Sequence, residues 1–166
     1  MQPALSGLWD FSLELYARPG VADACLHLQD TQAINVNLLL WCAWLDTRAI
    51  ALDEVRLHSG RKRIHAWDEH YVVPLRQLRR RMKAEFGVED AAIEAVRAQI
   101  KHAELLAERQ LQLWLEILAT SWDDKPEINR LTDWHNLRFY LQHMNVTEAA
   151  IAQILALFGS QSACAN

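Results

Sequence analysis

The chain has 166 residues, of which 51% are hydrophobic, and it contains seven Trp but only five Gly and four Pro. This composition excludes general disorder and a turn-rich β architecture, and the length fits one domain with a sizeable core. The net charge of −4 hides a local excess, because residues 56–83 hold nine Lys and Arg against two acids, so the remainder is strongly acidic.

Good helix formers dominate the composition, so we predict an all-α fold: a single-domain irregular helical bundle of about six to eight helices. Residues 1–158 are expected to form the domain, and residues 159–166 a flexible C-terminal tail. The N-terminus lacks the pattern of a secretory signal, and the apolar run 38–45 is much shorter than the roughly 20 residues that a membrane span needs. We therefore expect a cytoplasmic protein with reduced cysteines and no membrane contact.

Three helices are predicted in the first 48 residues. Ser6 can cap the first helix, which ends at a Pro-Gly pair, and the second spans about residues 21–29 and breaks at Asp30. The third, about residues 36–48, is apolar on nearly all sides, as is typical of a helix at the centre of a bundle. A buried strand would fit the same short run. The helical pattern of its neighbours favours the helix.

A short helical segment over residues 52–58 is expected to end at Ser59-Gly60, before a basic helix that spans residues 61–83. Pro74 should kink this basic helix near Tyr71 or start a new helix there. Its apolar residues recur at steps of three and four and so share one face: Ile64, Trp67, Tyr71, Leu75, Leu78 and Met82.

Residues 89–121 predict either one long helix or two stacked helices. An apolar seam is expected on this segment, interrupted only by Gln110, and a homodimer could form through it; the seam comprises Ile93, Val96, Ile100, Ala103, Ala107, Trp114 and Ile117. After a polar linker over residues 121–127, a helix with Leu131 and Trp134 on its apolar side should reach about residue 144. Thr147 should cap a last helix that closes at residue 159.

The cations of the basic helix are the first candidate for a binding surface. Their partner would be an acidic protein surface or a nucleic-acid backbone, since Trp67 and Tyr71 lie on the apolar stripe and offer no stacking platform for bases. The alternative is a solvated face that pairs with the chain's own acids. The predicted partner-binding set comprises seven residues: Arg61, Lys62, Arg63, Arg76, Arg79, Arg80 and Lys83.

A polar-lined pocket for an anionic ligand is the second candidate. Polar residues crowd the segment just before the most apolar helix, where they either cap helix ends or line a cleft. In the cleft, Asp30 would pair with an arginine of the basic helix. The predicted pocket set is Gln29, Asp30, Asn35, Asn37, Trp67 and Arg76.

No metal site or cofactor is expected. His65 and His70 are five residues apart, whereas helical zinc pairs are four apart, so we interpret His65 as a surface residue that pairs with Glu69. No GxSxG, P-loop, GxGxxG or paired-carboxylate motif occurs, so catalysis is less expected than binding.

Four segments together resemble a known family: LWDFSLELYARPGV, CLHLQD, NVNLLLWCAWL and VVPLRQLRRRMK. They are similar to a family of short proteobacterial proteins, known from Pseudomonas and Vibrio, that is defined only as a domain of unknown function. The resemblance covers roughly the first half of the chain, implies a bacterial cytosolic protein, and carries over no fold, cofactor or catalytic residue. Its motif positions are Trp9, Tyr16, Gln29, Asp30, Asn35, Asn37, Trp67, Pro74, Arg76, Arg79 and Arg80.

The leading functional hypothesis is a non-enzymatic binding or regulatory module that docks an acidic partner through the basic helix. The alternative is a helical-bundle enzyme or small-ligand binder that uses the polar-lined pocket.

Overall fold

The computed structural model describes residues 7–122 and 134–159, and every regular element within these residues is helical. Because α4, the π-helical turn η1 and α5 follow one another without a break, the described residues form seven helical segments, and the predicted all-α bundle is confirmed. The elements are α1 (Leu8–Tyr16), α2 (Val21–Gln32), α3 (Val36–Thr47), α4 (Glu54–Trp67), η1 (Asp68–Val72), α5 (Val73–Phe86), α6 (Ala91–Thr120), α7 (His135–His143) and α8 (Glu148–Gly159).

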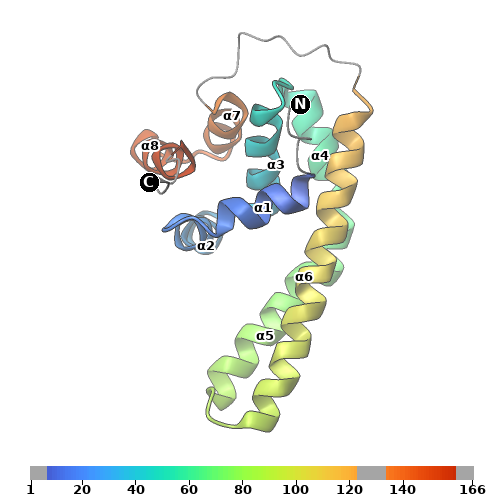
Figure 1. Ribbon diagram of the computed structural model, residues 1–166, viewed down its shortest axis with the longest axis vertical. Helices are drawn as coiled ribbons and strands as arrows, with labels where there is room; N and C mark the ends of the chain where they lie inside the picture. Colours follow the sequence, from blue (N-terminus) through green and yellow to red (C-terminus); the bar gives the residue numbers. More distant parts are fainter. Residues whose placement is uncertain (1–6, 123–133, 160–166) are drawn as a thin grey trace, which may run out of the picture.

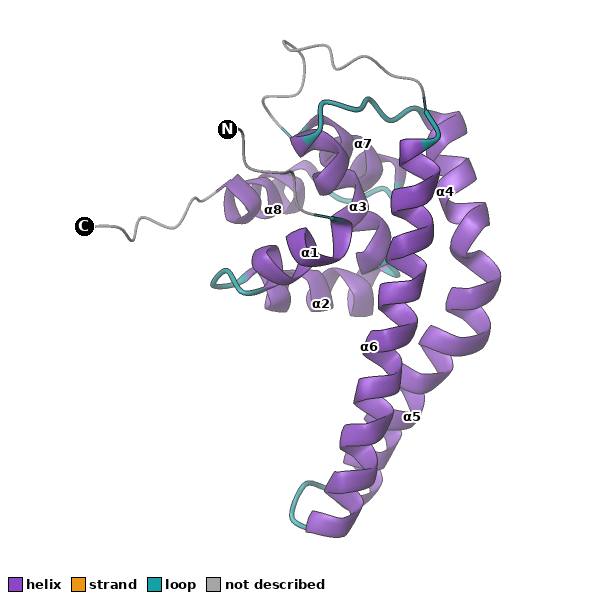
Figure 2. Cartoon of the chain, turned by 45° about the vertical axis from the view of Figure 1, so that its right-hand side comes forward, coloured by secondary structure: helices purple, strands orange, loops and turns teal. Residues whose placement is uncertain are grey.

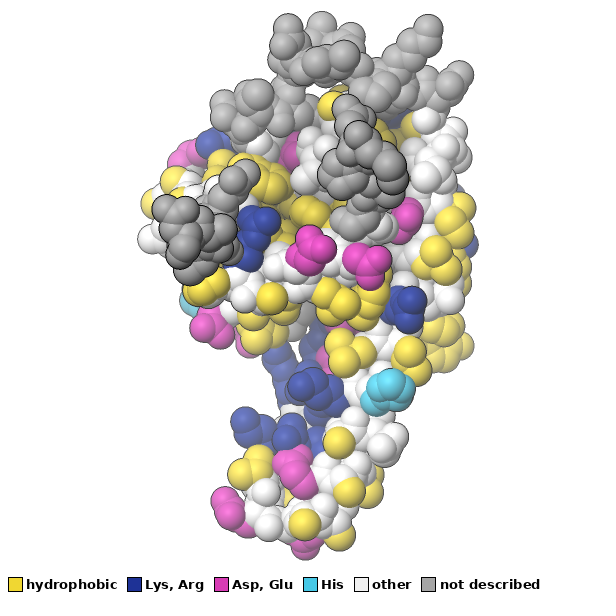
Figure 3. All heavy atoms as spheres, in the orientation of Figure 1, with side chains coloured by type: hydrophobic (Ala, Val, Ile, Leu, Met, Phe, Trp, Pro, Cys, Tyr) yellow, Lys and Arg dark blue, Asp and Glu magenta, His cyan; other side chains and the backbone are white. Residues whose placement is uncertain are grey.

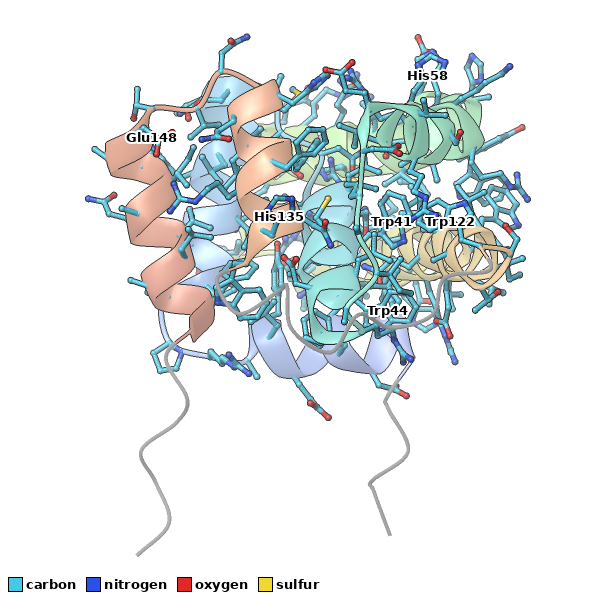
Figure 4. The ribbon with its side chains drawn as sticks, turned by 90° about the horizontal axis from the view of Figure 1, so that it is seen from above. Trp41, Trp44, His58, Trp122, His135 and Glu148 are labelled. Atoms are coloured by element: carbon cyan, nitrogen blue, oxygen red, sulfur yellow. The ribbon has the colours of Figure 1, made fainter. Side chains whose placement is uncertain are left out.

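Helix α3 is the centre of the core, as its sequence predicts. Its residues 36–46 are all buried, and α1, α2, α6 and α7 pack around it (Figure 1). Trp41 lies on the side of α3 that faces Trp122, with ring centroids 5.7 Å apart (Figure 4). A helix surrounded on every side needs no polar face, which explains its uniformly apolar sequence.

Helices α5 and α6 form a two-helix arm that projects from the other helices. We call those helices, together with the rest of α6, the body. In Figure 2, α5, the connecting turn and the first part of α6 (residues 73–103, the arm) extend well beyond the other helices. No residue of α5 is fully buried, because each helix of a two-helix arm has only one neighbour. The stability of the arm therefore depends on the face that α5 shares with α6.

The π-helical turn explains how the basic helix accommodates Pro74. Proline has no N–H to donate to the preceding turn, and just before it the N–H of Val73 donates to the carbonyl of Asp68, five residues back. Near Tyr71, where a kink or a new helix was expected, the structure has a π turn within a continuous helical segment. The extra residue of the π turn also shifts the helix face, so Val72 is buried while Tyr71 is 53% exposed. The place predicted for Tyr71 on the buried stripe is wrong.

Two predicted helix ends are also wrong. Helix α4 runs through Gly60, because this glycine lies against Trp41: a Cβ atom here would be 2.6 Å from the indole ring. Helix α2 runs through Asp30 to Gln32, and the Thr31 hydroxyl donates to the carbonyl of His27 within the helix.

Residues 91–120 form one continuous helix, which begins at an Asp90 N-cap and settles the choice between one helix and two. The apolar seam predicted on it is mostly wrong. Its outer members Val96 and Ile117 are exposed, and the buried face consists of Glu104, Ala107, Leu111, Gln112, Leu115 and Ala119. Two of these residues are polar, so a search for apolar residues alone selects the wrong face.

Helix α7 is tied to α3 by a buried carboxylate. Asp46 accepts hydrogen bonds from the backbone N–H groups of Asn136 (2.9 Å) and Leu137 (3.1 Å), which lie in the first turn of α7. Burial raises the pKa of Asp46 to about 6. Asn136 in turn accepts from the N–H of Leu52 at 2.8 Å. This joint fixes α7 beside the central helix.

The last two helices follow their predicted patterns where the structure describes them. Leu137 and Leu141 of α7 are buried, as are Ile151 and Ile154 of α8. The Thr147 hydroxyl accepts from the N–H of Ala150, as expected of a cap. Four predictions fall on residues outside the described ones. They are the cap at Ser6, the start of the predicted helix that contains Leu131, most of the polar linker, and the tail from residue 160.

Within the described part of the chain, no helix has the length and apolar character required to cross a membrane.

Candidate ligand-binding pocket

A cavity of about 200 Å³ lies where the arm joins the body. Figure 3 shows Lys and Arg side chains gathered at this junction. We call this cavity the junction pocket. Five helices line it, with Trp9, Ser12, Leu13 and Tyr16 of α1, Leu26 and Gln29 of α2, Val36, Asn37 and Leu40 of α3, Arg76, Arg79 and Arg80 of α5, and Lys101, Glu104, Leu105, Glu108 and Gln112 of α6.

The two walls of the junction pocket differ in chemistry. All six charged lining residues come from α5 and α6, which carry four cations and two carboxylates. The residues from α1, α2 and α3 are apolar, aromatic or neutral polar. The pocket therefore has a charged wall with an excess of positive charge, opposite a largely apolar wall.

Glu104 organises the charged wall. Arg79 donates to both of its carboxylate oxygens, at 2.5 and 3.1 Å, and the Nε of Arg76 donates to one of them at 3.2 Å. Arg76 also donates to Glu108 at 2.7 Å. Glu104 is buried, and both arginine side chains are mostly buried. A buried charge is tolerated when it is paired and hydrogen-bonded in this way, and the network holds both guanidinium groups in fixed orientations.

Two further cations at the pocket are less constrained. Arg80 donates to Asp30 at 2.8 Å, in a pair whose side chains are both about half exposed. The bond to Arg80 lowers the pKa of Asp30. Lys101 is exposed and makes no ion pair with any residue that the structure describes. Lys101 and Arg80 are thus the cations most open to an incoming anion.

A chain of neutral polar groups runs along the inner side of the pocket. The Ser12 hydroxyl donates to Gln112 at 3.0 Å, and the Gln112 amide donates to Asn37 at 2.9 Å. All three residues are buried. Of the six buried polar or charged residues among those described, four line this pocket: Ser12, Asn37, Glu104 and Gln112. Buried polar groups are concentrated here rather than spread through the core.

Burial raises the pKa of two titratable groups that line the pocket, Glu108 and Tyr16. Burial raises the pKa of Glu108, although its partner Arg76 opposes the effect. Burial also raises the pKa of Tyr16, and it raises that of Cys25, the hydrogen-bond partner of Tyr16, to about 12. Tyr16 is therefore neutral at physiological pH.

The predicted pocket set is brought together only in part. Gln29, Asn37 and Arg76 line the junction pocket, and Asp30 pairs with Arg80 of the basic segment at its edge. The other two members lie elsewhere. Asn35 caps α3 by accepting from the N–H of Leu38, and its amide donates to Asp68 at 3.0 Å. The indole of Trp67 donates to the carbonyl of Ala107 at 2.9 Å, and Trp67 is not among the residues that line the pocket.

The predicted partner-binding set also divides in two. Arg76, Arg79 and Arg80 pair with the chain's own acids, as the alternative interpretation of this face anticipates. The other four cations, Arg61, Lys62, Arg63 and Lys83, lie outside the pocket and are exposed. The guanidinium of Arg63 also lies over the Trp114 ring, 4.5 Å from its centroid.

Sequence reasoning missed the residues that α6 contributes. Glu104 and Glu108 are four residues apart, a spacing that places two carboxylates on one helix face and complements the spacing of Arg76, Arg79 and Arg80. That charge pattern was a usable signal. Ser12 and Gln112 carry no signal in the sequence, because only the packing of α1 against α6 makes them partners.

The described residues contain no group of three or more His, Cys, Asp and Glu side chains that could hold a metal ion. The Nε2 atom of His65 on α4 lies 3.3 Å from the Oε2 atom of Glu69 on η1, and both side chains are exposed, the arrangement that the spacing predicts.

Comparison with known families places this pocket within a recognised domain. A family model described as "Protein of unknown function (DUF2390)" matches residues 7–115. The chain belongs to this family. The DUF2390 match extends beyond the first half of the chain, to which the sequence resemblance pointed, and it includes every residue that lines the junction pocket, while α7 and α8 lie outside it. No curated protein and no solved structure matched the chain.

The motif positions that support the family resemblance gather around the pocket. Seven of the eleven line it: Trp9, Tyr16, Gln29, Asn37, Arg76, Arg79 and Arg80. An eighth, Asp30, is the partner of Arg80. The segments that identify the family at the sequence level are thus largely the segments that build one site.

Proposed function

We propose that this protein is a binding module for a small anionic organic molecule, which it holds in the junction pocket. The observation that carries the proposal is the charge of the site. Four lining cations face two lining carboxylates and Asp30, the partner of Arg80 at the pocket edge, so one positive charge is in excess, and Lys101 is free of any ion pair among the described residues. A concave site with an excess of positive charge and low-dielectric walls favours anions.

The ion network supports this function by preparing the site in advance. Arg76 and Arg79 are already held by Glu104, so an incoming ligand does not have to order them. Preorganisation of this kind raises affinity by reducing the entropy lost on binding. We also propose, from the sequence resemblance, that the protein is of proteobacterial origin and lies in the cytoplasm.

Isothermal titration calorimetry with benzoate and phenyl phosphate tests the proposal. At least one probe should bind the wild-type protein, and Lys101→Gln should weaken binding about fivefold, since one exposed charge interaction is worth about 1 kcal/mol. Lys62→Gln is the matched control, because Lys62 is an exposed lysine on α4 outside the pocket. If neither probe binds, or if both variants weaken binding equally, the junction pocket is not an anion site.

A second candidate function is the docking of an acidic partner on α4. His58, Arg61, Lys62 and His65 recur at i, i+3, i+4 and i+7 and are all exposed, and neither Arg61 nor Lys62 makes an ion pair within residues 7–122 and 134–159. In Figure 4, His58 points away from the body. The partner would be an acidic protein surface or a nucleic-acid backbone, as predicted above for the whole basic helix.

Binding of a fluorescent single-stranded oligonucleotide and of an acidic peptide, each at two salt concentrations, tests this second function. The double variant Arg61→Gln/Lys62→Gln should weaken binding of the partner and reduce its salt dependence. Arg81→Gln is the control, since Arg81 is an exposed arginine on the arm. Binding that is unchanged in the double variant would exclude α4 as the docking face.

A further inference from the structure

The exposed leucines around the junction pocket suggest what kind of anion it holds. Leu13, Leu26 and Leu105 are 52%, 42% and 41% exposed, yet they come from three different helices and line the same pocket. Single exposed leucines are ordinary, but three that converge on one cavity form an apolar rim. A purely polar ligand would leave this rim in water.

The walls of the pocket separate the two ends of such a ligand. The anionic group would lie at the charged side chains of α5 and α6, and an apolar body against the wall built by α1, α2 and α3 and against Leu105 of α6. An apolar cavity of about 150 Å³ holds one benzene ring. A cavity of about 200 Å³ therefore has room for a hydrocarbon body of roughly six to eight carbons.

The contact between Arg80 and Asp30 indicates the type of anionic group. Arg80 already holds a carboxylate, in a half-exposed pair of the kind that contributes little to stability. A ligand carboxylate can take the place of the Asp30 side chain beside Arg80, and the unpaired Lys101 lines the same pocket. The site is therefore matched in charge to a single carboxylate.

We infer that the ligand is a medium-chain monocarboxylate, with its carboxylate at Arg80 and Lys101 and its hydrocarbon body among Leu13, Leu26 and Leu105. This inference rests on the proposed function and specifies its ligand class. It predicts that affinity depends on the length of the hydrocarbon chain, whereas a general anion site would show no such dependence.

Titration calorimetry with acetate, butanoate, hexanoate, octanoate and decanoate tests the inference. Affinity should rise about fourfold per added CH₂ group, the ratio given by the transfer free energy of a buried CH₂, and should level off near octanoate because the cavity is then full. Octan-1-ol and octylamine are the controls for charge, and both should bind more weakly than octanoate.

Two exposed leucines provide matched variants. Leu26→Gln should reduce the gain in affinity per CH₂, while Leu113→Gln, a similarly exposed position of α6 outside the pocket, should leave it unchanged. An affinity that does not depend on chain length, or a loss that is equal in both variants, would overturn the inference. In that case the binding of benzoate or phenyl phosphate would still stand as evidence for the proposed function.

Discussion

Glu104 connects the arm to the site. It lies on α6, and its carboxylate accepts hydrogen bonds from Arg76 and Arg79 of α5. These ion pairs join the two helices beside the junction pocket. The bond to Glu104 raises the pKa of Arg79. Removal of one member of a buried ion pair leaves its partners without compensation, and this costs more than the pair itself contributes.

The variant Glu104→Gln should therefore destabilise the protein. We expect a loss of about 2 kcal/mol in the free energy of unfolding, less than the about 3–5 kcal/mol typical of fully buried pairs, because both arginines remain in contact with water. Urea denaturation measures it. Glu94→Gln is the control, since its partner Arg97 lies on the same helix near the end of the arm, and it should change stability little. Equal losses in the two variants would show that Glu104 has no special role.

Asp46 should make stability depend on pH. Its pKa in the folded protein is about 6, above the value of about 3.9 for an unfolded chain, so the folded state binds the proton more tightly. This contribution to stability is fully present below about pH 4 and is lost as the pH rises through 6. Asp46 should thus lower the free energy of unfolding by about 2–3 kcal/mol between pH 4 and pH 7.

The comparison of the wild-type protein with Asp46→Asn isolates this effect. Urea denaturation at several values between pH 4 and pH 7.5 should show that the difference in stability between the two proteins changes with pH in the stated direction. Other titrating groups contribute to both proteins and cancel in the difference. A difference that is constant with pH would show that Asp46 does not titrate in this range.

At the scale of the elements, the continuous helical segment formed by α4, η1 and α5 shows what sequence patterns can predict and what they cannot. Pro74 correctly marked the irregularity, because its missing N–H is a local property. The shift of the buried face from Tyr71 to Val72 could not be predicted, because it depends on how the π turn inserts one residue. Gly60 was misread as a helix end, since the close neighbour that requires a glycine is Trp41 on another helix.

Gly60→Ala tests this interpretation of the glycine. Helix propensity alone would stabilise an interior helical site by about 1 kcal/mol. The new Cβ would instead lie 2.6 and 2.8 Å from two atoms of the Trp41 ring, so we expect a net loss of about 1–3 kcal/mol from overpacking. Thermal and urea denaturation measure the change, with Ser59→Ala as the neighbouring control. A stabilised Gly60→Ala protein would mean that Trp41 moves aside at little cost.

The candidate site shows the same limit of sequence reasoning. Gln29 and Asn37 were selected from the sequence because polar residues next to an apolar helix stand out, and Arg76 as an arginine of the basic helix that could meet them; all three line the pocket. Asn35 was wrongly included, because a capping residue and a pocket residue have the same local signature, and only its bond to Leu38 distinguishes them. Ser12 and Gln112 were missed, since their role arises from contacts between helices that are 100 residues apart in the chain.

On the scale of the whole molecule, the arm and the body share one function in this account. The body supplies the apolar wall of the junction pocket, and the arm supplies most of its charge. A pocket at the meeting point of two structural parts is a common place for a ligand. A homodimer through residues 93–117 stays a prediction, and exposed Val96 and Ile117 keep that face available.

Mapping of backbone amide chemical shifts in the ¹⁵N-labelled protein during titration with benzoate is the most direct test of the central claim. The largest changes should occur at Ser12, Leu26, Asn37 and Leu105, which come from four helices and meet only at the junction pocket. Amides of α4 around Lys62 should not move. If the shifts cluster on α4 instead, or if saturating benzoate moves none of the pocket amides, the claim that the junction pocket binds a small anion is wrong.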